Sequence, residues 1–318
     1  MREVSIKVID PKQINLFGFL PGIVIGFLLG LPAVAAGPQA SKNFEIPNVH
    51  IRDGALFSDF DQWWCRGSMI PQQDPVFSRI KRGRFSINPS DDTVIIPAEW
   101  ADEAKNTRLP ALRAAADRRL PILFAKTAQI VGRGFKQKDY DYFFYLCPFW
   151  NGATASSRTF PLFPYLRAAV GEQQWPDWLF TDQFLFHETL HLYVIEKIDY
   201  TVGTPVLNAV YEKLMSDPDF DGKIKAYLKF PEKVPPEMEM QWRQAKLGMV
   251  SAVLVHVHVY AIMTSVYKAL GQVDVLKTIR DSEMNNAAPH PAYVKAWEYI
   301  ISIENSPKQM KAVLSEVR

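Results

Sequence analysis

The chain has 318 residues, of which 36 are Lys or Arg and 34 are Asp or Glu, so the formal net charge is +2. This near balance gives no electrostatic indication of nucleic-acid binding, and we expect none. Hydrophobic residues make up 48% of the chain, and the length suffices for one large or two moderate domains with a substantial core.

Residues 1–36 have the pattern of a signal peptide. Arg2, Lys7 and Lys12 give a weakly positive start, residues 16–36 are almost wholly apolar, and small residues stand where a signal peptidase cuts. We therefore expect a secreted or periplasmic protein. The alternative is an uncleaved membrane anchor, because a segment of this length just spans a bilayer.

The two cysteines, Cys65 and Cys147, both lie in the part that would be exported. An oxidising compartment permits one disulfide between them. Two buried free thiols are the alternative, since the sequence does not give their separation.

Residues 37–174 predict a mixed α/β lobe. Short extended runs come first, and two helices follow at 98–119 and 121–131, with Pro110 indicating a break or restart within the first. The aromatic run at 140–149 predicts a buried strand. Residues 159–166 predict an edge strand, because their two prolines exclude a central one.

Residues 175–318 predict a helical lobe, so the fold class is α+β. The first helix begins near Thr181 and ends near Ile198. Thr204 and Pro205 are typical of a helix N-terminus, and that helix should reach Ser216. Further helices are expected at 221–228, 237–270, 273–282 and 291–305.

The stretch His187-Glu188-Thr189-Leu190-His191 lies on the first of these helices. Four-residue spacing puts both histidines on one helical face, near enough to bind a single divalent ion. Two imidazoles and an adjacent carboxylate are the parts of a zinc hydrolase, in which Glu188 takes a proton from water. The alternative is an interior helix whose histidines form hydrogen bonds with protein groups.

Catalytic zinc usually has three protein ligands. Glu212 is the first candidate for the third, because it lies on the helix that follows and a hairpin can fold it back; an exposed glutamate is the competing interpretation. His256 and His258 are the second candidates. On a helix they point ~200° apart, so at most one faces the metal helix, whereas on a strand they share a face.

His256 is slightly preferred over His258, either as a ligand or as a catalytic imidazole that stabilises an oxyanion. Each is also a plausible core residue. His290 is interpreted as a surface turn residue and His50 as structural.

At His187 to His191 the chain resembles the zincin metallopeptidases. The resemblance implies His187 and His191 as zinc ligands and Glu188 as the general base of peptide hydrolysis. It also implies a strand-rich upper lobe with an edge strand for substrate, then the active-site helix, then a helical lower lobe.

Within that superfamily the chain is more similar to gluzincins than to metzincins. The metzincin pattern requires Gly and His where this chain has Val194 and Lys197. Gluzincins take the third ligand from a glutamate on the next helix, the place that Glu212 occupies. The neighbouring residues differ from the gluzincin pattern, which puts this ligand in doubt.

Together these features predict an exported zinc-dependent metallohydrolase that acts on peptides or proteins. The alternative is an exported binding or scaffold protein whose histidine helix holds a structural metal or none.

Overall fold

The computed structural model describes residues 44–53, 86–87, 94–95, 106–107, 109–145, 159–161, 182–200, 203–285 and 289–317. The predicted signal peptide, both cysteines and the expected lobe boundary at residues 174 and 175 lie outside these ranges.

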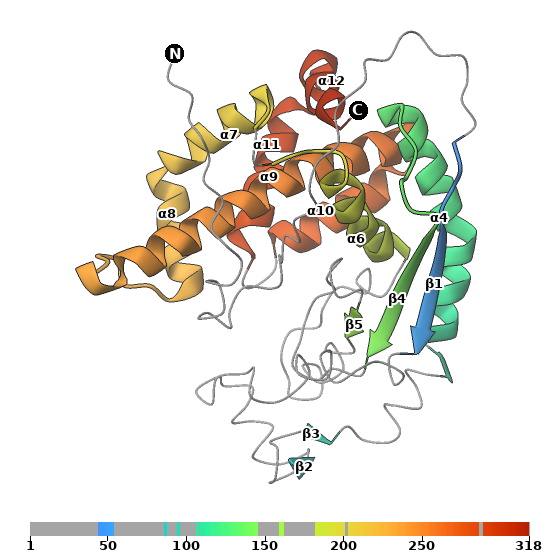
Figure 1. The fold of residues 1–318 in the computed structure, drawn as a ribbon, viewed down its shortest axis with the longest axis horizontal. Coiled ribbons are helices and arrows are strands. Elements are labelled where there is room, and N and C mark those ends of the chain that lie inside the picture. The colour runs from blue at the N-terminus through green and yellow to red at the C-terminus, as the bar shows by residue number, and fades with distance from the viewer. Residues whose placement is uncertain are drawn as a thin grey trace. The chain divides into compact units, whose positions relative to one another are not determined.

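The described residues form two compact units (Figure 1). One comprises residues 44–122 and 137–188, and the other 123–136 and 189–317. The boundary between the two units falls inside two helices, α4 (Leu109–Val131) and α6 (Asp182–Ile195).

The first unit contains a small parallel sheet in the order β1 (Asn48–Asp53), β4 (Asp139–Tyr145), β5 (Thr159–Pro161). Alternation in β4 buries Tyr140 and Tyr142, while the intervening acidic residue remains partly exposed. A separate antiparallel pair joins β2 (Ser86–Ile87) to β3 (Val94–Ile95). The strand after residue 139 and the edge position of β5 agree with the prediction.

Helix α4 runs without interruption through Pro121, so the prediction of two helices separated there was wrong. Its buried residues recur every three or four positions, from Leu109 through Leu120 to Val131. Pro121 lies on the exposed side, where the loss of one backbone hydrogen bond is offset by water. Arg113 Nε donates to the carbonyl of Ile51 at 2.8 Å and ties the helix to β1.

In the second unit, α7 (Pro205–Met215) starts where the sequence predicted. The Thr204 hydroxyl accepts from the backbone N–H of Leu207. Helix α8 (Pro218–Leu228) begins earlier than predicted, because Asp217 caps its first turn by accepting from two backbone N–H groups.

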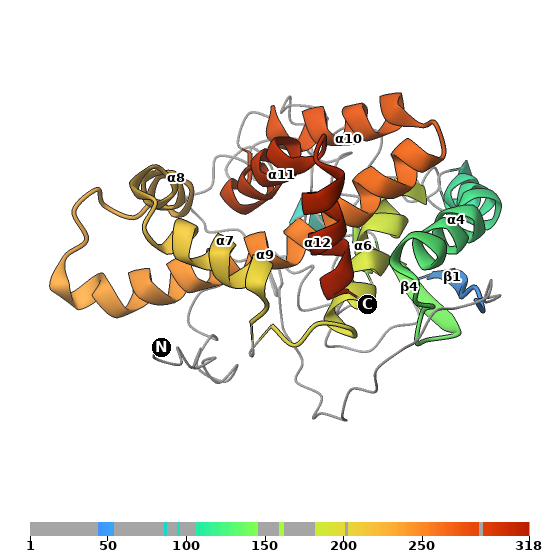
Figure 2. The same ribbon diagram turned by 90° about the horizontal axis from the view of Figure 1, so that it is seen from above.

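The longest helix, α9 (Glu239–Ala269), follows a short 3-10 turn (Pro236–Met238) and packs against α7, α8, α10 (Val273–Met284), α11 (Pro291–Ile303) and α12 (Pro307–Glu316). Figure 2 shows α11 and α12 alongside it. Helix α12 was not predicted. Among the described residues, the segment Pro236–Ala269 is long and apolar enough to cross a membrane, but 83% of its most apolar window is buried, as in a core helix.

The described residues are therefore mostly helical with a small sheet, which is compatible with the predicted α+β class.

Candidate metal centre

Helix α6 presents His187 and His191 one turn apart on one face. The opposite side of this helix is buried and includes Leu185 and Tyr193. Within the first unit, Arg119 Nε holds the buried carboxylate of Asp182 at 3.0 Å at the start of α6. Within the second, the Tyr193 hydroxyl donates to the carbonyl of Arg133 at 2.7 Å. These contacts hold both ends of the helix.

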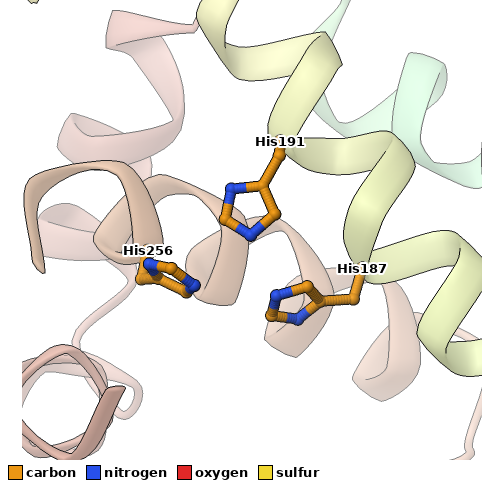
Figure 3. Close-up of side chains that lie close together, drawn as sticks. All are labelled: His187, His191 and His256. Atoms are coloured by element: carbon orange, nitrogen blue, oxygen red, sulfur yellow. The ribbon is translucent and has the colours of Figure 1, made fainter. Parts of the chain in front are cut away.

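His256 on α9 joins these two histidines. One ring nitrogen of each residue lies within 4.8 Å of those of the other two (Figure 3). The rings of His191 and His256 are 4.5 Å apart between centroids and meet edge to face. His187 lies next to His191 because both residues are on the continuous helix α6, one turn apart. His187 and His256 are only 3% and 1% exposed, whereas His191 is partly exposed.

The hydrogen bonding of His256 defines which ring nitrogen is available as a ligand. Its Nδ1 lies 2.7 Å from the carbonyl oxygen of Ala252. A carbonyl only accepts, so Nδ1 carries the hydrogen and, in the neutral ring, Nε2 carries the lone pair. Burial lowers the pKa of His256 to about 4, with the Ala252 hydrogen bond opposing the shift. The ring is therefore neutral near pH 7 and suited to metal binding.

This donor set fits a transition metal. Three nitrogen ligands of a tetrahedral zinc ion lie about 3.3 Å from one another, so the ring nitrogens, within 4.8 Å of one another here, would move closer by up to about 1.5 Å around the ion. Imidazole nitrogens suit zinc, copper, nickel, cobalt or iron, whereas magnesium and calcium take oxygen ligands. An outer hydrogen bond such as the one to Ala252 commonly orients a ligating histidine.

Glu188, the predicted general base, follows His187 directly on α6 and is 6% exposed. A buried carboxylate is costly unless charge or hydrogen bonds compensate it. Its burial beside a ligand residue agrees with a role at the centre, and its identity as a base stays a prediction.

Glu212 does not complete the ligand set, so that prediction is corrected. Its side chain is exposed on α7, and it is not part of the histidine cluster. Leu207, Val210 and Leu214 form the buried face of α7, and the helical period turns position 212 away from them. His256, the second candidate for the third ligand and also considered as a catalytic imidazole, lies with His187 and His191 instead.

His258 points away from this cluster, as expected for two residues on one helix. Residues 252–260 are helical, which excludes the strand alternative. Its Nε2 lies 3.1 Å from Glu316 Oε2, and its Nδ1 lies 3.2 Å from the Tyr200 hydroxyl.

Ring contacts continue from His256 to Tyr293 and His290, which were not predicted to lie near the histidine cluster. The ring of Tyr293 lies 4.4 Å from that of His256, and His290 lies 4.4 Å from Tyr293 and 5.0 Å from Tyr227. Burial, together with the nearby His256, lowers the pKa of His290 to about 3. His290 directly precedes α11 and is half-buried against Tyr293 and Tyr227, so it is more covered than an exposed turn residue. Its place next to two prolines hid the packing partners, which come from α8 and α11.

His50 agrees with its structural interpretation. Its Nε2 lies 3.1 Å from Asp139 Oδ1, where β1 and β4 pair.

No family model, curated protein or solved structure matches this chain. The function is therefore inferred from the sequence motif and from the geometry of the three histidines.

Proposed function

We propose that the protein is a metal-dependent hydrolase whose metal, most suitably zinc, is held by His187, His191 and His256. The convergence of three imidazole nitrogens within 4.8 Å is the observation that carries the proposal. Three histidines are one of the ligand sets of catalytic zinc, and they leave a fourth position for water or substrate. This set differs from the two histidines and glutamate on which the gluzincin comparison relied.

When bound, the metal supplies a Lewis acid that polarises a carbonyl group and lowers the pKa of water. The protein residues supply the remaining functions. His187 and His191 fix the ion to α6, His256 fixes it to α9, and Glu188 accepts the proton of the attacking water. Of the three histidines only His191 is partly exposed, so solvent and substrate would approach a bound ion from its side.

The proposed substrate is a peptide or another amide, in line with the resemblance of the motif to zincin metallopeptidases. The proposed place of action is outside the cytoplasm, because of the signal-peptide pattern in residues 1–36.

The decisive experiment compares the wild type with Glu188→Gln and His256→Ala. We expect about one zinc per chain in the wild type and in Glu188→Gln, measured by elemental analysis, and much less in His256→Ala. Hydrolysis of a peptide library should fall by at least about 100-fold in Glu188→Gln, the range attributed to general-base catalysis. Wild-type activity in Glu188→Gln would disprove the role of Glu188.

One observation favours a second function, a structural metal in a binding or scaffold protein. Two of the three histidines are almost fully buried, as in sites that a metal closes for stability. In that case the wild type would bind zinc without chelator-sensitive hydrolysis, and metal removal would reduce only its stability.

A further inference from the structure

The second histidine of α9, His258, connects four segments of the helical unit. It is fully buried, and its Nε2 lies 3.1 Å from Oε2 of Glu316 in the last turn of α12. The other oxygen of Glu316 accepts from the backbone N–H of Val206, at 2.9 Å, in the first turn of α7. Tyr200, after the end of α6, places its hydroxyl 3.2 Å from Nδ1 of His258. We call Tyr200, His258, Glu316 and the Val206 N–H the Glu316 clip.

The donors and acceptors of the clip are complementary. Burial opposes ionisation of Glu316, but hydrogen bonds from His258, Thr204 and Val206 hold its pKa below the ordinary value. The ionised carboxylate only accepts, so Nε2 of His258 carries a hydrogen. Nδ1 of His258 lies 3.2 Å from the Tyr200 hydroxyl and 3.3 Å from the carbonyl oxygen of Leu254, so it accepts from Tyr200 in the neutral ring and donates to Leu254 when it carries a hydrogen. A buried network satisfied in this way favours one arrangement of its helices.

The clip constrains α9 on the side opposite the metal centre. His256 and His258 are two residues apart and therefore project ~200° apart around the helix axis. His256 faces His191 of α6, while His258 is held by α12 and by Tyr200, five residues beyond the last residue of α6. Rotation of α9 about its axis would break the clip and move the His256 ring.

We propose that Glu316 is a positioning residue that, through His258, sets the rotation of α9 and thereby the affinity of the three histidines for metal. This inference rests on the proposed metal site. It assigns to the C-terminal helix α12 a role in metal binding, although the helix contributes no ligand.

The test measures zinc affinity of the full chain by competition with a chromophoric chelator, together with the visible absorption spectrum of the cobalt form. The variants are Glu316→Ala, Glu316→Gln and Tyr200→Phe. The matched control is Glu304→Ala, because Glu304 pairs with Lys268 of α9 at 3.1 Å and with Arg280 of α10 at 3.7 Å. Lys268 lies about 18 Å along α9 from His256.

We expect Glu316→Ala to weaken zinc binding about tenfold, the lower end of losses seen when groups that orient ligands are removed. The cobalt spectrum should change with it. Glu316→Gln, which keeps one acceptor oxygen, should lose less, and Tyr200→Phe should show a small loss in the same direction. Glu304→Ala should bind zinc like the wild type even where its apo form is less stable.

Two results would overturn the inference. One is wild-type affinity in Glu316→Ala; the other is a loss no greater than in Glu304→Ala at matched apo stability. Either would leave the proposed hydrolase intact. If Glu316→Ala does not fold, Glu316→Gln and Tyr200→Phe decide by the same criterion. A wild type that binds neither zinc nor cobalt would refute the metal site and the clip together.

Discussion

At the scale of single residues, burial shifts the pKa values of His256 and Glu283 in opposite directions. It disfavours the charged form of each group, so it lowers the pKa of His256 to about 4 and raises that of Glu283 to about 7. Glu283 on α10 accepts from the Tyr260 hydroxyl at 2.6 Å and from the Trp297 indole at 2.5 Å. These two rings stack at 4.0 Å, so the carboxyl group joins α9, α10 and α11.

Glu283 should make stability depend on pH. Its pKa is higher in the folded than in the unfolded chain, so its contribution is greatest below about 4.5 and is lost as the pH rises to about 7. His256 has a lowered pKa and acts in the opposite direction, with its contribution lost as the pH falls towards about 4.

We therefore predict that Glu283→Gln raises stability relative to the wild type more at pH 8 than at pH 5. The amide oxygen keeps an acceptor for Tyr260 or Trp297 but has no proton to lose. Urea unfolding of the metal-free protein at both pH values measures the difference. An equal stability difference at the two pH values would contradict the prediction.

At the scale of elements, helices α7, α8 and α12 begin at residues whose side chains accept from backbone N–H groups. Asp217 Oδ1 accepts from Asp219 and Phe220 at 3.0 and 3.1 Å, and its Oδ2 lies 2.9 Å from Lys295 Nζ of α11. A hydrogen bond from Lys295 lowers the pKa of Asp217 despite partial desolvation. One side chain thus starts α8 and joins it to α11.

Replacing Asp217 should separate these two effects. Asp217→Ala loses both the cap and the ion pair, and we predict a stability loss of about 1–2 kcal/mol. Asp217→Asn keeps a capping oxygen and weakens only the partly buried ion pair with Lys295, so it should lose less stability than Asp217→Ala, about 1 kcal/mol. Chemical denaturation of both variants gives the comparison; equal losses would show that the cap contributes little.

At the scale of the whole molecule, a metal held by α6 and α9 would couple binding to folding. The ligands are 69 residues apart at their extremes in the sequence, and the unfolded chain does not hold them together. Apo protein should therefore be less stable than the metal-bound form, whether the metal is catalytic or structural.

Zinc at about 1,000 times its dissociation constant should stabilise the fold by about 4 kcal/mol and raise the melting temperature by about 10 °C. Thermal unfolding with zinc and with a chelator measures this shift. His256→Ala is the control and should show much less of it. The same rise in wild type and His256→Ala would place the zinc elsewhere.

The sequence by itself determined the features that depend on near neighbours. Four-residue spacing placed His187 and His191 on one face of α6, and Thr204 with Pro205 defined the start of α7, because capping and helical periodicity act within a turn. The aromatic alternation of β4 was equally local. Helix α12 was not predicted from the sequence. Helix α4 continues through Pro121 because the proline faces solvent.

Only the tertiary structure decided which residue lies beside His187 and His191 as the third candidate ligand. Glu212 and His256 were both reasonable from their spacing, but which helical face meets α6 depends on long-range packing. The apolar residues of α7 rotate Glu212 outward, and the packing of α9 rotates His256 inward and His258 towards Glu316. The sequence predicts a metal-binding helix; the arrangement of α9 decides which residue lies beside its two histidines.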